Sequence, residues 1–352
     1  MNGFAVPNLF VLIAAAFGAP ARFDTVILPE IRPVNRVELV AAVAGDTLRY
    51  IEKYHAADFA PGALLPGVTA DAALLTLRRV AGAGEQLADP VYLERCFSAL
   101  RWVPDSDKWG GKIRLTRYLV YEVIGADSPT TTYTHALYAT PDDETGLSLG
   151  DALARRDSLD RFKFTRQDIA GGVFREGGSA AGRAKPLVWL SHDDHEQAIL
   201  QGTVSVRTAA GARLFNVDRD NGIPYDRSTT DTKKQRRYWY FRETDAVRGA
   251  GEAGEQKVAL QPGAAVAGDL ENIGLGTFIA LQAADGLHLV VVADTGGAFQ
   301  PNLHQLDLYT GAFPSYAAFS SATAKIGDTA TAYILLAKPD VAGCDAGSAL
   351  PE

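Results

Sequence analysis

The chain has 352 residues, 34 Lys and Arg against 42 Asp and Glu, a formal net charge of −8 and 47% hydrophobic residues. These values are typical of a globular protein of about two domains and exclude a wholly disordered chain or a coiled coil. The acidic balance without a dense Lys/Arg cluster argues against a nucleic-acid partner. The 34 glycines and 17 prolines, spread along the chain, favour many short strands, so we expect a mostly β protein.

The first twenty residues contain an apolar stretch from Leu9 to Phe17 followed by small residues. The stretch fits a secretory signal, but no Lys or Arg precedes Arg22, and it fits equally the first buried element of the protein. No cysteine follows it to carry a lipid, and it is too short to span a membrane.

The next part of the chain is predicted to be helical for about a hundred residues. Apolar residues at helical spacing predict a first helix over 35–55, and two more are predicted over 70–81 and 90–100. From Lys112 onward, strand-like runs alternate with turn signals. The stretch 218–236 reads as an exposed loop and 248–256 as a flexible piece, whereas Asp285-Gly286 separates two apolar runs and predicts a hairpin. The tail after Lys338 reads as a loose end.

Two cysteines occur, Cys96 and Cys344, without metal-ligand spacing around either. We predict two unpaired or buried thiols, although a single bridge between them stays open. His192 and His195 lie in SHDDHE, which reads as a solvated acidic turn, with a divalent-cation site as the alternative. No Walker loop is present, and the G-x-S-x-G match at 146–150 and the G-x-G-x-x-G match at 249–254 follow no apolar strand-like run, so the sequence does not support the corresponding enzyme classes.

Two aspartates carry the most informative pattern. Asp294 ends an apolar run and is followed at once by a glycine turn, where burial would raise its pKa. Asp307 alternates with Leu306 and Leu308, so Gln305 and Asp307 are predicted to share the polar face of a strand. Two acids on neighbouring strands leave one protonated near neutral pH, which suits general acid catalysis on a glycosidic oxygen. Alternatively, Asp294 caps a turn and Asp307 faces solvent.

Several short motifs in one order resemble the membrane-bound lytic transglycosylase A family, peptidoglycan-cleaving enzymes with a C-terminal three-aspartate domain. The strongest stretch is VVVADTGGAFQPNLHQLDLYTG, residues 290–311, which contains the Asp-Thr-Gly-Gly-Ala and Asp-hydrophobic-aromatic elements. LQPG at 260–263, Asp269 and GLGT at 274–277 resemble the elements before it. Weaker matches run from residue 112: Leu115-Thr116 with Tyr118, LY at 137–138 with PDD at 141–143, AILQGT at 198–203, NGIPY at 221–225 and YFRE at 240–243.

The resemblance implies a mainly β fold with N-terminal helices. A double-psi β-barrel domain would comprise residues 1–118 and 238–352, and a smaller β domain, 119–237, would be inserted in it, with the glycan in the groove between them. The implied protein is a periplasmic or secreted, monomeric enzyme of the bacterial cell envelope that needs no cofactor or metal and has no transmembrane segment.

The resemblance also implies the roles of individual residues. Asp307 matches the family's single catalytic acid, and Asp294 and Asp269 match supporting aspartates. The residues that would bind the glycan strand are Asp269, Gln201, Gly202, Thr116, Tyr118, Gly296 and Gly297. Asp307 would protonate the bond between N-acetylmuramic acid and N-acetylglucosamine, and the muramyl 6-hydroxyl would then close a 1,6-anhydro ring.

The sequence also departs from the family pattern. Arg117 replaces a glycine, Leu119 and Val120 replace an aromatic residue and an acid, and Phe299-Gln300 stand where Ile-Lys is usual. These changes bear on groove shape and substrate. They keep open a glycosidase or lyase acting on another polysaccharide, and a non-catalytic glycan-binding protein.

Overall fold

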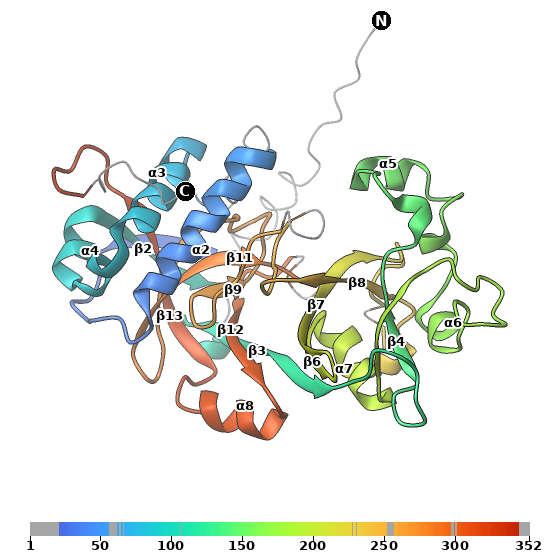
Figure 1. Cartoon of the computed structure of the whole chain (residues 1–352). Helices are drawn as coiled ribbons and strands as arrows, with labels where there is room; N and C mark the ends of the chain where they lie inside the picture. Colours follow the sequence, from blue (N-terminus) through green and yellow to red (C-terminus); the bar gives the residue numbers. More distant parts are fainter. Residues whose placement is uncertain are drawn as a thin grey trace, which may run out of the picture. The chain divides into compact units, whose positions relative to one another are not determined.

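The computed structural model describes residues 21–55, 62, 65, 67–105, 107–226, 228–229, 231–251, 257–296, 299 and 301–344. It is a mainly β chain with several helices, as predicted (Figure 1). The chain forms two compact units: unit 1 comprises Met1–Arg117, Gly263–Leu308 and Lys325–Glu352, and unit 2 comprises Tyr118–Pro262 and Tyr309–Ala324. The first twenty residues and most of the stretch 248–256 lie outside the described residues, so the structure does not test the interpretations of these segments.

Unit 1 contains the three predicted helices, α2 (Val37–Tyr50), α3 (Ala70–Ala83) and α4 (Pro90–Cys96). A single π-helical turn continues α2 to His55. Side chains that accept hydrogen bonds from the first turn mark the starts of α3 and α4, because Thr69 and Asp89 bond to the backbone amides of Ala72 and Val91.

The prediction of a wholly helical N-terminal segment was wrong. The third helix ends at Cys96 rather than at residue 100, and β2 (Phe97–Pro104) follows at once. A further strand, β1 (Ala21–Val26), precedes the helices and pairs with β2. On its other edge β2 pairs with β13 (Thr329–Ala337), from the opposite end of the chain. Partners this distant decide the strand conformation, and local periodicity does not reveal them.

The strands of unit 1 follow the order β1-β2-β13-β10-β11-β9-β12-β3. In addition to β1, β2 and β13, these strands are β3 (Ile113–Ile124), β9 (Ala265–Ala267), β10 (Phe278–Gln282), β11 (Leu287–Asp294) and β12 (Gln305–Phe313). β13 also pairs with the start of β3, so the pairings from β13 through β10, β11, β9, β12 and β3 form a closed cycle. Because β9 and β11 are parallel and their other neighbours antiparallel, the sheet is mixed.

The predicted hairpin is confirmed. β10 and β11 are antiparallel, with Phe278 opposite Val291 and Gln282 opposite Leu287. Gly286 adopts φ +144°, a conformation that L side chains rarely adopt. Alternate apolar residues of both strands, Ile279 and Leu281 with Val290 and Val292, enter one core, which also contains Leu306 and Leu308 of β12. This core supports the strands that carry the predicted aspartates.

Unit 2 has its own core and a second, smaller sheet. Its larger sheet runs from β3 through β6 (Thr203–Thr208) and β7 (Gly211–Asp220) to β8 (Trp239–Thr244), and β4 (His135–Tyr138) pairs with β5 (Pro186–Leu190). Its helices are α5 (Leu149–Ala154), α6 (Arg166–Ala170), α7 (His192–Gln201) and α8 (Tyr316–Thr323).

The stretch 218–236 of unit 2 is less exposed than predicted. It starts inside β7, and three of its polar side chains are buried, Asp218, Asn221 and Gln235. The Asn221 side-chain amide donates to the carbonyls of Phe164 and Arg236, and its oxygen accepts from the Tyr238 amide at 3.0 Å. Burial is possible because these backbone groups satisfy the amide completely.

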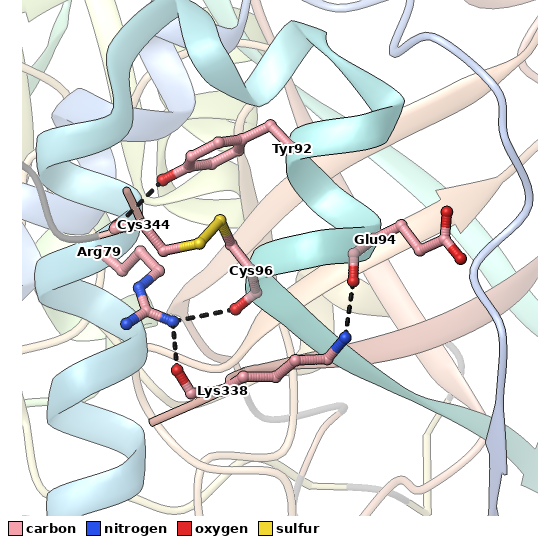
Figure 2. Close-up of a disulfide and its surroundings, with 6 residues drawn as sticks. All are labelled: Arg79, Tyr92, Glu94, Cys96, Lys338 and Cys344. Carbon is pink, nitrogen blue, oxygen red and sulfur yellow. Dashed lines mark hydrogen bonds between the residues drawn. A yellow bond between two sulfur atoms is a disulfide. The ribbon is translucent and has the colours of Figure 1, made fainter. Parts of the chain in front are cut away.

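Cys96 and Cys344 form a disulfide with a Cα–Cα distance of 5.6 Å, which corrects the prediction of unpaired thiols (Figure 2). Cys96 ends α4, and Cys344 is buried although the tail was predicted to be loose. The Arg79 guanidinium donates to the carbonyls of both Cys96 and Lys338, and Lys338 Nζ donates to the carbonyl of Glu94 at 2.7 Å (Figure 2). The end of the described chain is therefore held against α3 and α4.

Within the described residues, no helix has the length and apolar character needed to cross a membrane.

Candidate functional site

Three aspartates of unit 1 gather around the end of the short strand β9. β9 lies between β11 and β12, and its last residue, Ala267, is opposite Asp294 on β11 and opposite Asp307 on β12. Asp269 follows two residues later. Residues directly opposite each other in a sheet project their side chains to the same face. The pairing of Asp294 follows a register irregularity after Val292, and Asp294 lies close enough to Asp307 for its negative charge to raise the pKa of that carboxyl.

The alternation of β12 places Asp307 outside the core, as predicted. Leu306 and Leu308 are fully buried in the core of unit 1, whereas Gln305 and Asp307 are half-buried. Successive side chains of a strand point to opposite faces, so the carboxylate of Asp307 and the amide of Gln305 lie on the face away from these leucines.

The pKa of the Asp307 carboxyl is raised toward neutral pH. Burial raises its pKa to about 6, and the negative charge of Asp294 adds to the increase, while Thr116, Arg114 and Arg117 oppose it. Its Oδ1 atom is buried and has no hydrogen-bond partner among the described residues. An acid with this pKa is protonated in a large fraction of molecules near pH 6 and has an oxygen free for another partner.

Asp294 ends β11 and lies at the start of a turn. Its Oδ1 accepts a hydrogen bond from the Thr295 amide at 2.8 Å, and the side chain is half-buried. Gly296 is exposed and its carbonyl accepts from the Phe299 amide at 2.9 Å. Gly297, predicted to bind the glycan, lies outside the described residues. The predicted strand end at Asp294 is confirmed, whereas the predicted glycine turn extends into residues outside the described part of the chain.

Asp269 is 1% exposed, and both of its oxygens are bonded. Oδ1 accepts from the Asn272 amide at 3.1 Å, and Oδ2 accepts from the Asn272 side chain at 2.8 Å and from the Asn302 amide at 3.0 Å. The carboxylate thereby connects the loop after β9 to the loop before β12. This burial favours a positioning role over direct contact with a glycan.

A hydrogen-bonded row of side chains flanks Asp307 on β3 and β12. Gln305 Nε2 donates to Thr116 Oγ1 at 3.0 Å, and Thr116 Oγ1 donates to the carbonyl of Leu306 at 3.3 Å. Arg114, two residues before Thr116, donates to Gln305 Oε1 at 3.3 Å. The sequence reasoning missed Arg114. The two-residue period of the strand could have identified it, because this period places Arg114 on the same face as Thr116.

Arg117, which stands where the resembling family has glycine, is bonded to the loop before β13. It donates to the Gly327 carbonyl and, at 2.7 Å, to Asp328 Oδ1. Its side chain is 18% exposed. Its positive charge also lowers the pKa of Asp307, so the substitution affects the electrostatics of the acid.

The remaining predicted binding residues belong to unit 2. Gln201 is the last residue of α7, and Gly202 ends that helix with φ +78°, a left-handed conformation that favours glycine. The Tyr118 ring lies 5.3 Å from that of Tyr309, between ring centres, and the Tyr118 carbonyl accepts from Thr310 Oγ1 at 2.8 Å. Helix termination explains why Gly202 is a glycine, and contact of these residues with a glycan remains a prediction.

The SHDDHE segment was wrongly predicted to be a solvated turn. It forms the first part of α7, which Ser191 caps, and His195 is buried. Burial lowers the pKa of His195 to about 3, and the electrostatic effect of His135 contributes to the decrease. The imidazole is therefore neutral. His192 Nδ1 lies 3.4 Å from His135 Nε2. No group of three or more potential ligands suited to a metal ion exists among the residues that the structure describes.

The backbone of the chain is similar to those of solved lytic murein transglycosylases. The membrane-bound enzyme of Agrobacterium tumefaciens has a TM-score of 0.66 and 19% identity, over 90% of this chain and 98% of the other. E. coli MltA with bound chitohexaose has a TM-score of 0.59 and 16% identity, over 90% and 95% of the two chains. MltA from Neisseria gonorrhoeae has a TM-score of 0.58 and 15% identity, over 92% of each chain.

The chain has the lytic murein transglycosylase fold. No protein-family model and no curated protein sequence matches it. At 15–19% identity the relationship is visible in the backbone rather than in overall sequence similarity. The resemblance first recognised in short motifs therefore agrees with the tertiary structure over nearly the whole chain.

Proposed function

We propose that this protein is a peptidoglycan lytic transglycosylase. It cleaves the β-1,4 bond between N-acetylmuramic acid and N-acetylglucosamine and forms 1,6-anhydromuramic acid. The observation that carries the proposal is the Asp307 carboxyl, whose pKa is raised to about 6 and whose Oδ1 has no partner among the described residues. The fold likeness to lytic murein transglycosylases supports the same substrate class.

In the proposed reaction Asp307 acts first as an acid and then as a base. The protonated carboxyl gives its proton to the glycosidic oxygen, the bond from that oxygen to C1 of the muramyl sugar breaks, and C1 develops oxocarbenium character. The Asp307 carboxylate then removes the proton of the muramyl 6-hydroxyl, whose oxygen bonds to C1. The carboxyl ends the cycle protonated, and no water is consumed.

One carboxylate is sufficient because the nucleophile belongs to the substrate. Ordinary glycosidases need a second carboxylate to attack C1 or to activate water. In this proposal Asp294 instead keeps Asp307 protonated, since its negative charge raises the pKa of Asp307. Asp269 acts through Asn302, which donates to Gln305 Oε1 at 3.4 Å on the face of β12 that carries Asp307.

The proposed setting is the bacterial cell envelope. The Cys96–Cys344 disulfide supports an oxidising compartment such as the periplasm or the exterior, because disulfides rarely persist in the cytosol. We also propose that the closed cycle of six strands in unit 1 is the double-psi β-barrel implied by the family resemblance, with β9 as the strand that brings the aspartates together.

The deciding experiment is digestion of purified sacculi with analysis of the soluble products by mass spectrometry. Muropeptides ending in 1,6-anhydromuramic acid are expected from the wild-type protein. Asp307→Asn should abolish their release while it retains glycan binding, because the amide keeps the shape but has no transferable proton. Retained activity in this variant would remove Asp307 from the role.

A glycosidase or lyase acting on another polysaccharide is the second candidate. The E. coli relative was crystallised with chitohexaose, a glycan without muramic acid. Incubating the wild-type protein with chitin oligosaccharides and other polysaccharides tests this candidate. Cleavage of these glycans without anhydromuramic products from sacculi would favour it. Binding to sacculi without any products would instead indicate a non-catalytic glycan-binding protein.

A further inference from the structure

A patch of basic and aromatic side chains lies beside the acid in unit 1. We call Lys108, Trp109, Arg114 and His304 the basic aromatic patch. The rings of Trp109 and His304 are stacked, with 5.4 Å between their centres and 22° between their planes. The Lys108 ammonium lies 5.0 Å from the centre of the Trp109 ring. Trp109 is half-buried and His304, Lys108 and Arg114 are exposed, so solvent reaches the patch.

The backbone and one side chain connect the patch to the row of residues around Asp307. The Arg114 amide donates to the His304 carbonyl at 2.7 Å, which fixes the start of β3 against the residue before β12. The Arg114 side chain donates to Gln305, which in turn donates to Thr116. Arg114 is thus bonded to Gln305, which precedes Asp307 by two residues on the same face of β12, about 7 Å along the strand. A ligand longer than one sugar ring therefore reaches both Arg114 and Asp307.

The electrostatics of the patch favour an anion. Arg114 bonds to the neutral amide oxygen of Gln305 and to no carboxylate among the described residues, so most of its five N–H donors remain for a ligand. Burial and the charges of Arg114 and Lys108 lower the pKa of His304, so its imidazole is neutral near pH 7 and stacks as an uncharged ring. Arg114 also acts on Asp307, whose pKa it lowers.

We propose that the basic aromatic patch is a subsite for a sugar that carries a carboxylate. The aromatic pair receives the apolar face of the sugar ring, and Arg114 binds the carboxylate. A planar guanidinium binds carboxylates through two parallel hydrogen bonds. This inference rests on the proposed function, in which the substrate is peptidoglycan. In its muramic acid the lactyl carboxyl is amide-linked to the peptide stem, so the carboxylate that the sugar carries belongs to this acidic stem, whereas chitin has neither group.

Isothermal titration calorimetry on the Asp307→Asn protein tests the subsite without turnover. Two probes of equal glycan length are compared: chitin hexasaccharide, which is neutral, and a peptide-bearing peptidoglycan fragment, which is anionic. The protein with an intact patch should bind the anionic probe more tightly. Adding Arg114→Gln should weaken binding of the anionic probe about tenfold, as expected for a lost charge-assisted hydrogen bond. Binding of the neutral probe should change less than twofold.

Two control variants isolate the charge of Arg114. Arg114→Lys keeps the charge and should retain most of the preference for the anionic probe. Arg78→Gln removes an exposed cation on α3 that pairs with Glu52, away from the patch, and should leave both affinities unchanged. Trp109→Ala should weaken both probes, because it removes the aromatic face that either sugar would use.

The inference is overturned if Arg114→Gln leaves the ratio of the two affinities unchanged, or if it weakens both probes equally. The proposed function is judged separately, by the anhydromuramic products of the active protein. Active digestion with no charge preference at the patch refutes the subsite alone. A charge preference without anhydromuramic products refutes the transglycosylase assignment alone.

Discussion

Asp294 and Asp307 are both in register with Ala267, one from each neighbouring strand. The two carboxyl groups are near enough for the charge of Asp294 to act on Asp307, although a register irregularity after Val292 precedes the Asp294 pairing. Each charge therefore acts on the other through partly buried surroundings, where Coulomb interactions are less screened than in water. Burial is the main cause of the raised pKa of Asp307, and the charge of Asp294 adds to it; the first predictions depend on this pKa.

The pH dependence of glycan cleavage should follow the protonation of Asp307. Because the reaction starts from the protonated carboxyl, kcat/KM should fall as the pH rises through about 6, the pKa of this group in the free protein. Initial rates measured on sacculi between pH 4.5 and 8 check this. A rate that is flat from pH 5 to 8 would contradict the role of Asp307 as the proton donor.

Asp294→Asn should move the alkaline limb of that profile to lower pH. The substitution removes a negative charge that raises the pKa of Asp307, so the carboxyl ionises more readily. The measurement is the apparent pKa of kcat/KM in the variant. Asp24→Asn, which removes an exposed carboxylate of β1 paired with Arg22, is the matched control and should leave the profile in place. A shift to higher pH would refute the like-charge interaction.

Asp307→Asn should stabilise the protein at neutral pH. The folded-state pKa of about 6 lies above the unfolded value, so the free energy of unfolding of the wild type falls between about pH 4 and 6 as the carboxyl ionises. Above this window the buried charge costs about 3 kcal/mol, which the asparagine variant avoids. Urea unfolding at pH 4.5 and 7.5 checks the prediction, and a stability difference that is larger at the acidic pH would contradict it.

Removing the disulfide should destabilise unit 1. Cys96 and Cys344 are 248 residues apart in the sequence, so the bridge restricts the unfolded chain strongly. The double variant Cys96→Ser, Cys344→Ser should lower the free energy of unfolding by about 2–5 kcal/mol. Thermal unfolding with and without a reductant measures this. Reductant should lower the melting temperature of the wild type and leave that of the double variant unchanged.

Asp269→Asn should reduce activity by misplacing the loop before β12. An asparagine side chain can accept hydrogen bonds through one oxygen only, so one of the donors on Asn272 or Asn302 loses its partner in a buried site. The expected cost is about 1–3 kcal/mol of stability, together with a lower kcat. Since Asp269 does not contact the acid directly, the apparent pKa of kcat/KM should stay unchanged. A variant with wild-type kcat and stability would refute the positioning role.

The local features of the chain were predictable because they depend on near neighbours in the sequence. Helical periodicity identified α2 and α3, and the Asp285-Gly286 turn identified the β10–β11 hairpin. The two-residue alternation from Gln305 to Leu308 correctly separated the core face of β12 from the face that carries Asp307. Each of these patterns is complete within a few residues, and packing against one core reinforces it.

By itself, the sequence determined a mainly β chain, the strand face of Asp307 and a family resemblance. Only the tertiary structure decided that β9 lies between the two aspartate strands, that Cys96 pairs with Cys344, and that His195 is buried in a helix. The physical reason is that these features depend on pairing and packing between segments far apart in the chain. Strand register, burial and the resulting pKa of a carboxyl arise from neighbours that no local pattern specifies.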